Sequence, residues 1–237
     1  MEVVRGIVLK VQAFSDTQKI VHIFTQERGY LSFISPSFIF KKNNLTACAM
    51  QVVEAEFYEN QKNGLHKLAS LSPLFNTSAV YFDIYKMNIA LLWSEVLNIL
   101  LRNEQKNEVM FHFLVKAVEY LNTTREDVAN FNLFFLYRLA APAGFKIDIS
   151  SYSPGYVFNI HAGRFSSPDA GLPYISGPNA AKTICELCSC KLEELKNISL
   201  NRESRNVLLD IILLFFGIHL NTDFNVKSVK VIREVFD

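Results

Sequence analysis

Hydrophobic and polar residues alternate through residues 3–35, with two short polar interruptions. A period of two places one face of a strand on a core and the other in water, so this stretch predicts strands. The interruptions at residues 15–17 and 26–29 hold Ser, Asp, Thr and Gly, which favour chain reversals. In the first strand, Ile7, Leu9, Val11 and Ala13 form one face, and Val8, Lys10 and Gln12 form the other. The stretch therefore predicts a meander of three antiparallel strands.

Two further alternating segments, residues 49–58 and 65–71, follow a polar loop. Between them, Asn63 and Gly64 favour a tight hairpin because both residues tolerate positive φ. Pro73 ends the last segment, since proline cannot continue a strand ladder. Five strands in one stretch are enough to close a small barrel, and this pattern is typical of an OB fold.

After Asn76 the apolar residues recur at three- and four-residue spacing, which is the period of a helix. Helices are predicted over residues 77–101, 107–121, 180–191, 201–220 and 226–236. Another is predicted to start at a capping box of Thr123 and Glu126 and to break at Pro142. Residues 145–178 are rich in glycine and proline, and they predict an irregular insertion with a small β-hairpin. We expect an α+β protein, with a five-stranded OB-fold barrel over residues 1–75 and a mostly helical domain over residues 76–237.

Two segments of the chain are similar to segments of a known family. GIVLK is followed by a D-T-x-x-I-V-x-I-F-T-x-E-x-G run, and the chain closes on HLNTDFNVKSVKVIREVF. Both resemble the bacterial DNA repair and recombination mediator RecO, and the likeness covers the whole length. The resemblance implies binding of single- and double-stranded DNA, promotion of strand annealing, and help in loading RecA. It also implies two direct partners, RecR and the acidic, apolar tail of single-stranded-DNA-binding protein, the latter in an exposed apolar pocket bordered by basic side chains.

The overall charge gives no sign of a nucleic-acid partner. The chain has 24 Lys and Arg against 23 Asp and Glu, a net charge of +1, and residues 1–75 carry eight basic and six acidic side chains, a net charge of +2. DNA binding would therefore have to come from local clusters. The near-neutral charge favours an alternative, a protein-interaction module that has lost direct DNA binding and acts as a docking platform.

The loop after the meander combines two lysines, Lys41 and Lys42, with two aromatics, Phe38 and Phe40. Lysines contact phosphates and aromatic rings stack on bases, so this loop is a candidate single-strand site. The other interpretation is a solvated tip beside two rings that close the barrel's end. Further candidate DNA contacts lie in the meander and on a basic ridge of the final helix; they are Lys10, Arg28, Lys227, Lys230 and Arg233.

Cys185, Cys188 and Cys190 spell C-x-x-C-x-C and suggest a zinc site. A structural zinc ion needs four converging ligands, and positions i, i+3 and i+5 of a helix do not converge. By resemblance, relatives with a metal carry a first C-x-x-C where this chain has residues 149–153 without cysteine, a degenerate zinc-finger-like region. We therefore predict no metal and no cofactor, and small buried thiols that pack one helix.

The sequence shows neither a catalytic constellation nor a membrane segment. Its five histidines are scattered, and no glycine-rich phosphate loop is present, so we expect no enzyme activity. The longest apolar run, residues 211–218, is far below the roughly 20 residues that span a bilayer. The start MEVVRG does not have the form of a signal peptide, and the cysteines do not form a secreted disulfide pattern. A cytoplasmic, nucleoid-associated protein is expected.

Overall fold

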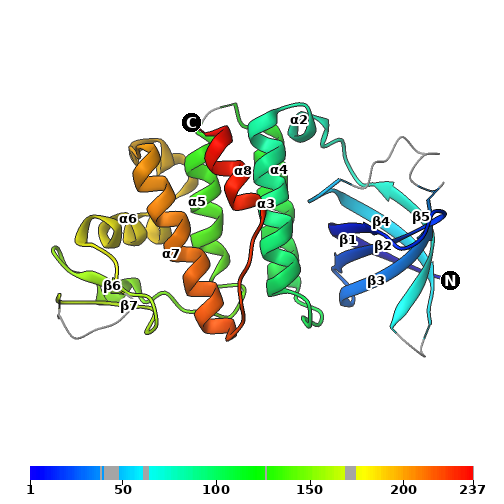
Figure 1. Ribbon diagram of the computed structural model, residues 1–237, viewed down its shortest axis with the longest axis horizontal. Helices are drawn as coiled ribbons and strands as arrows, with labels where there is room; N and C mark the ends of the chain where they lie inside the picture. The colour runs from blue at the N-terminus through cyan, green and yellow to red at the C-terminus, as the bar shows by residue number, and fades with distance from the viewer. Residues whose placement is uncertain (38, 40–47, 61–63, 126, 169–174, 237) are drawn as a thin grey trace. The chain divides into compact units, whose positions relative to one another are not determined.

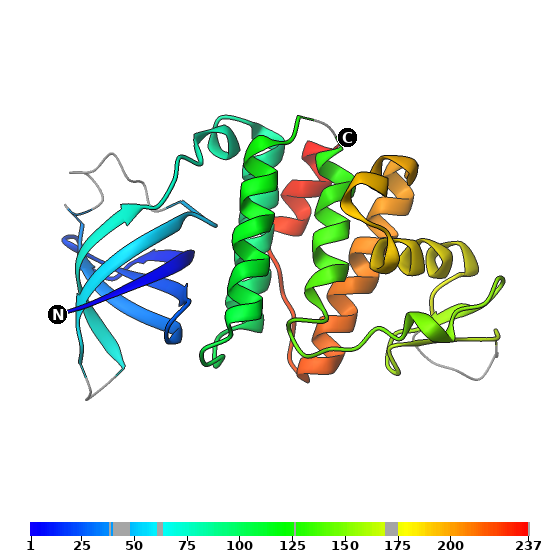
Figure 2. The same ribbon diagram turned by 180° about the vertical axis from the view of Figure 1, so that it is seen from behind.

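The computed structural model describes residues 1–37, 39, 48–60, 64–125, 127–168 and 175–236. Its first part is a closed barrel with the strand order β1-β2-β3-β5-β4 (Figure 1). The strands are β1 (Glu2–Ala13), β2 (Gln18–Thr25), β3 (Gly29–Pro36), β4 (Val52–Tyr58) and β5 (Leu65–Pro73). β3 pairs in parallel with β5, and β1 closes the barrel against β4 (Figure 2). The predicted α+β class and OB-like barrel are confirmed.

The barrel encloses an apolar core, and the alternation in β1 is interrupted within it. The core contains Val4, Val8, Val21, Ile23, Phe33, Ile39, Val53, Ala55, Phe57, Leu68 and Leu71. The pairing of β1 with β2 shifts between Val8 and Lys10, so that Leu9 is the extra residue of a bulge. The expectation that Val8 faces away from the core was therefore wrong. Ile7 and Leu9 are buried as well, because α3 packs against β1 from outside.

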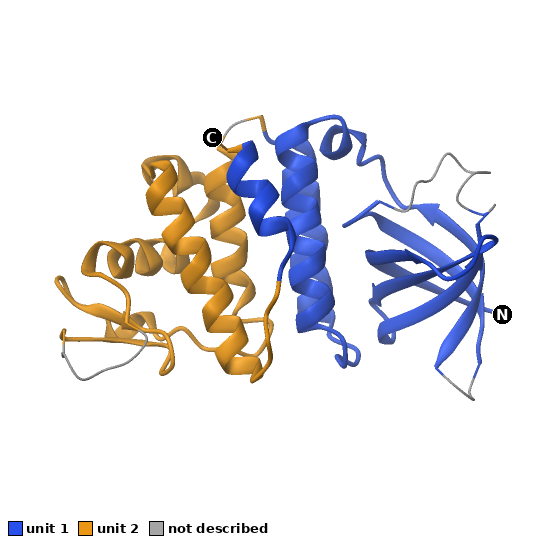
Figure 3. Cartoon of the chain, in the orientation of Figure 1, with its two compact units in different colours: residues 1–124, 226–235 blue, residues 125–225, 236–237 orange. Residues whose placement is uncertain are grey.

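Contacts divide the chain into two compact units (Figure 3). The first unit, residues 1–124 with 226–235, contains the barrel and, in the part that the structure describes, the helices α2 (Ser78–Tyr81), α3 (Ile84–Leu100), α4 (Glu108–Thr123) and α8 (Ser228–Val235). The single helix predicted over residues 77–101 is broken at Phe82 and Asp83, because the Asp83 carboxylate accepts hydrogen bonds from the backbone N–H groups of Tyr85 and Lys86 and starts a new helix.

The second unit, residues 125–225 with 236–237, contains helices and a small β-hairpin. Its helices are α5 (Val128–Leu139), α6 (Pro178–Ser189) and α7 (Arg202–Leu220), with short 3-10 turns η1 (Ile149–Ser151) and η2 (Leu192–Asn197). The hairpin is β6 (Val157–Asn159) and β7 (Arg164–Ser166), as predicted for this insertion. Every helix among the described residues is too short or too polar to cross a lipid bilayer.

The predicted capping box at the start of α5 is wrong. Thr123 is the last residue of α4, and its hydroxyl donates to the backbone oxygens of Glu119 and Tyr120. Asp127, in the left-handed region at φ 52°, precedes α5 instead, and Glu126 lies outside the described residues. The division at residue 75 also stays a prediction: β5 ends at Pro73, but the compact units group helices α2 to α4 and α8 with the barrel.

Candidate nucleic-acid interface

The outer face of β1, β2 and β3 presents a row of polar side chains. Lys10 is paired with His22, and His22 with Ser32 on the next strand. Val21 and Ile23, the sequence neighbours of His22, and Phe33, the neighbour of Ser32, belong to the barrel core. Because successive side chains of a strand point to opposite faces, His22 and Ser32 point away from the barrel interior. In an OB fold the outer surface of strands 2 and 3 is the surface that binds oligonucleotides.

His22 is fixed on this face by two neighbours from β3. Its Nδ1 shares a hydrogen bond of 2.8 Å with the Ser32 hydroxyl oxygen. Its ring stacks on Tyr30, with 5.6 Å between the ring centroids and 27° between the planes. The Tyr30 hydroxyl donates to Asn98 Oδ1 at 2.8 Å, and its backbone N–H donates to the Glu104 carbonyl at 3.0 Å. The end of α3 and the turn after it are thereby tied to the same face.

Two cations, Lys10 and Arg102, act on the His22 ring of this face. Burial, together with the positive charges of Lys10 and Arg102, lowers the pKa of His22 below its ordinary value. Burial raises the pKa of Tyr30 to about 12, and Arg102 opposes that shift. Lys10 and Arg102 are exposed, and neither forms a salt bridge with any carboxylate in the described part of the chain. We name Lys10, His22, Tyr30, Ser32 and Arg102 the outer-face cluster.

Only Lys10 of this cluster was predicted from the sequence. The alternation of β2 and β3 could have placed His22, Tyr30 and Ser32 on one outward face, because side chains two positions apart point the same way. Arg102 had no comparable signal. It follows the end of α3, and its approach to the barrel depends on the contacts that Tyr30 makes with this turn.

Arg28, a predicted DNA contact, is held by two carboxylates at the edge of the barrel. Its Nη1 donates to Glu2 Oε2 at 2.9 Å, and its Nη2 donates to Glu59 Oε1 at 2.6 Å. The guanidinium carbon lies 6.0 Å from the centre of the Phe57 ring. The Glu59 hydrogen bond, followed by that of Glu2, raises the pKa of Arg28. Its charge is already compensated, so its role in DNA binding stays a prediction and we omit it from the proposed contact surface.

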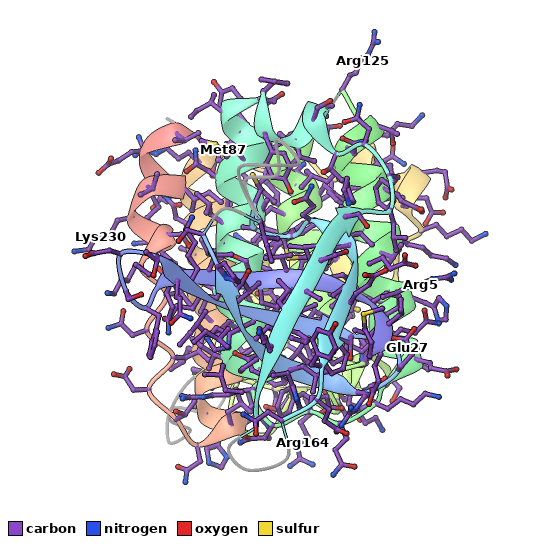
Figure 4. The ribbon with its side chains drawn as sticks, turned by 90° about the vertical axis from the view of Figure 1, so that its right-hand side faces the viewer. Arg5, Glu27, Met87, Arg125, Arg164 and Lys230 are labelled. Carbon is purple, nitrogen blue, oxygen red and sulfur yellow. The ribbon has the colours of Figure 1, made fainter. Side chains whose placement is uncertain are left out.

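The predicted basic ridge of the final helix is only partly exposed. α8 starts at Ser228, whose backbone N–H and hydroxyl both donate to Glu95 Oε2 of α3, at 3.0 and 3.1 Å. Lys227 and Lys230 are exposed, whereas Arg233 is half-buried. Figure 4 shows Lys230 and Arg5 at opposite edges of the view, pointing away from each other. Lys230 of this helix and Arg5, a basic residue of β1, therefore face different directions.

Exposed apolar side chains accompany these two lysines. Ile84, Leu91 and Glu95 lie on one stripe of α3, because they are seven and four residues apart, and Glu95 contacts the start of α8. Ile84 and Leu91 are 53% and 42% exposed, and Val231 of α8 is 45% exposed. Phe82, just before α3, is 91% exposed. We name Ile84, Leu91, Val231, Lys227 and Lys230 the α3–α8 surface, which combines apolar side chains with positive charge.

The predicted loop contacts cannot be placed. Lys41, Lys42, Phe38 and Phe40 all lie outside the described residues. Ile39 is described, and it belongs to the barrel core with 8% of its surface exposed. The predicted contribution of this loop stays a prediction.

The three neighbouring cysteines lie along α6 and at its end, and all are half-buried. Burial raises the pKa of the Cys188 thiol to about 12, and it raises the pKa values of Cys185 and Cys190 too. Zinc binds the thiolate form, so these environments disfavour a ligand role. In the described part of the chain, no three His, Cys, Asp or Glu side chains are grouped so that they could hold a metal ion.

The hydrogen bond between His22 and Ser32 does not make the Ser32 hydroxyl an activated nucleophile. A base that accepts the serine proton must become positive, and both Lys10 and Arg102 oppose a positive charge on His22. The interactions that shift its pKa include no carboxylate that would stabilise the imidazolium. The arrangement suits anion binding better than proton abstraction.

Comparison with known proteins gives the same family for both parts of the chain. The family model "Recombination protein O N terminal" matches residues 1–76, and "Recombination protein O C terminal" matches residues 81–228. A DNA repair protein RecO of Bacteroides fragilis is 29% identical over 238 residues, which are 98% of each chain. Those of Flavobacterium psychrophilum and Porphyromonas gingivalis are 28% identical over 238 residues and 26% identical over 242 residues, again covering 98% of each chain.

Proposed function

Because the chain belongs to the RecO family of DNA repair proteins, we propose that it is a recombination mediator that binds single- and double-stranded DNA and promotes annealing of complementary strands. In this proposal it helps RecR to load RecA onto DNA covered by single-stranded-DNA-binding protein. It does so as a cytoplasmic, nucleoid-associated protein, without a cofactor and without catalysing a reaction.

The observation that carries the proposal is the outer-face cluster. A single strand is bound by cations that contact phosphates and by flat rings that stack on bases. Lys10 and Arg102 supply exposed charge, and the Tyr30 ring, which stacks on His22, lies on the same face. These groups occupy the barrel surface that OB folds use for oligonucleotides, so net neutrality of the chain does not argue against DNA binding.

The proposal is tested by annealing and binding assays on the purified chain. We expect the chain to accelerate pairing of two complementary oligonucleotides, and to bind a fluorescent single strand with an affinity that falls steeply as salt rises. Each phosphate contact contributes about 0.7 to the slope of log affinity against log salt for a single strand. An affinity that is undetectable at low salt, or that does not depend on salt, would contradict direct DNA binding.

The α3–α8 surface is our proposed site for the tail of single-stranded-DNA-binding protein. An acidic, apolar peptide needs apolar contacts and nearby cations, and Leu91, Val231, Lys227 and Lys230 provide both. A cavity of about 780 Å³ beside the end of α7 fits less well, because its charged lining residue is Asp223. That acidic group would repel such a tail.

Calorimetry with a tail peptide at low salt tests this site. Lys227→Glu/Lys230→Glu should weaken binding by roughly tenfold or more, because like charges then face each other. Lys116→Glu is the matched control, since Lys116 is an exposed lysine of α4 in the same unit. The assignment fails if the peptide does not bind the parent chain, or if it binds the charge-reversed variant and the parent equally.

The alternative function is a docking platform without direct DNA contact. It is favoured by the net charge of +1, by the compensated charge of Arg28, and by the exposed apolar residues of the α3–α8 surface. Under this alternative the tail peptide binds and the oligonucleotide does not. The two assays above therefore separate the two functions.

A further inference from the structure

We propose that Lys10, His22 and Arg102 form a phosphate-binding subsite for single-stranded DNA, and that His22 takes up a proton when the phosphate binds. The inference rests on the proposed function and assigns a specific chemistry to one part of it. It predicts that single-strand affinity rises as the pH falls toward mildly acidic values.

The three side chains come from three different elements, and the charges of Lys10 and Arg102 both act on the His22 ring. Lys10 lies on β1 directly opposite His22 of β2. Arg102 comes from the turn after α3, and its charge acts on both His22 and Tyr30. The Ser32 hydroxyl and the Tyr30 ring hold the imidazole in place, with Nδ1 engaged at 2.8 Å. The described contacts of this ring leave Nε2 as the atom that can donate to a ligand oxygen.

The charges around His22 disfavour its protonated form until an anion arrives. β1 contributes Lys10 and the turn after α3 contributes Arg102, both positive. β3 contributes the neutral groups Ser32 and Tyr30, and β5 places Leu65 opposite Ser32. The carboxylate of Glu104, in the same turn as Arg102, accepts a hydrogen bond of 3.0 Å from the Asn107 side chain. A phosphate would supply the negative charge that the site lacks.

The sign of the pH effect follows from this arrangement. In the free protein the pKa of His22 lies below its ordinary value, so the imidazole is neutral near neutral pH. A bound phosphate stabilises the imidazolium and raises that pKa. Between the free and bound pKa values, binding is accompanied by proton uptake, so affinity increases as pH falls through this window. Above the window the affinity is independent of His22 protonation.

Stacking of the His22 ring on a base would be a different role, and two variants distinguish it. His22→Phe keeps a flat ring beside Tyr30 but cannot carry a proton. His22→Gln keeps a hydrogen-bonding group near Ser32 and loses the ring. A phosphate subsite requires both variants to lose the pH-dependent part of the affinity, whereas a stacking role requires His22→Phe to bind as the parent does.

The experiment is fluorescence anisotropy of an oligothymidylate of about 15 nucleotides at constant ionic strength, from about pH 5.5 to about pH 8. The parent should bind about three- to tenfold more tightly at the acidic end, and both His22 variants should lose this difference. His112→Gln is the matched control, because His112 is an exposed histidine of the same unit whose Nδ1 is bonded to its own helix at the Glu108 carbonyl. The control should behave as the parent does.

A spectroscopic readout separates this inference from the proposed function. Nuclear magnetic resonance titration of the His22 ring should show a pKa that rises when the oligonucleotide is added. If the parent does not bind the oligonucleotide, the proposed function fails. If it binds, but the pKa of His22 does not rise and the His22 variants keep the parent's pH dependence, the function stands and this subsite is refuted.

Discussion

Substitution of Arg28 tests whether this cation, predicted from the sequence to contact DNA, instead stabilises the barrel. The side chains of Arg28, Glu2 and Glu59 are 35%, 43% and 33% exposed, so solvent screens both ion pairs. Each such pair contributes about 0.2–1 kcal/mol, and the guanidinium near Phe57 adds about 0.5–1 kcal/mol. We therefore expect Arg28→Gln to lower the free energy of unfolding of the first unit by about 1–3 kcal/mol at low salt, and by less at high salt.

Urea unfolding followed by Trp93 fluorescence measures this effect, because Trp93 is the single tryptophan and is fully buried in the first unit. A double-mutant cycle with Glu59→Gln should give a favourable coupling energy between the two side chains. Arg102→Gln is the control with the opposite expected pattern. It should leave the free energy of unfolding unchanged and lower the slope of log DNA affinity against log salt. The reasoning is refuted if Arg28→Gln lowers that slope by about 0.7 or more and leaves stability unchanged.

Two further predictions concern the backbone and the cysteines. Gly29→Ala should destabilise the first unit by about 3 kcal/mol or more, because φ is +76° and the added Cβ would clash with the Glu104 carbonyl oxygen. Gly64→Ala is the control: its φ of +65° is also positive, but no atom lies near the added Cβ, so it should cost only about 1 kcal/mol in the same unfolding assay. Equal costs would show that the barrel does not approach the turn after α3. Elemental analysis should find no stoichiometric zinc in the purified chain. One zinc per chain that is lost on replacing Cys185 and Cys188 would overturn that prediction.

Local patterns predicted the barrel strands and helices well because each element follows from the spacing of its own apolar residues. The bulge at Leu9 could not be predicted in this way, since an alternating strand with one extra residue keeps a plausible pattern on each side of it. Burial of Ile7 and Leu9 on the outer face also depends on α3, which begins at Ile84, more than seventy residues later along the chain.

The site was harder to predict because charge compensation is not local. Arg28 contacts Glu2 and Glu59, which lie 26 and 31 positions away, and no spacing rule joins them. Arg102 lies in the turn that follows α3, and the hydroxyl and N–H of Tyr30 join the end of α3 and this turn to β3, about seventy positions earlier in the chain. The candidate DNA contacts chosen from the sequence therefore included an arginine whose charge is compensated and left out one that is exposed.

The most direct test of the account compares salt slopes for three pairs of cations. The pairs are Lys10→Gln/Arg102→Gln, Lys41→Glu/Lys42→Glu and Lys227→Glu/Lys230→Glu, measured with a fluorescent single strand beside the parent chain. Removing the outer-face pair should lower the slope by about one to one and a half, because two phosphate contacts are lost. A steep slope in the parent that the Lys10/Arg102 variant leaves unchanged would contradict the claim that DNA lies on the outer face of the barrel.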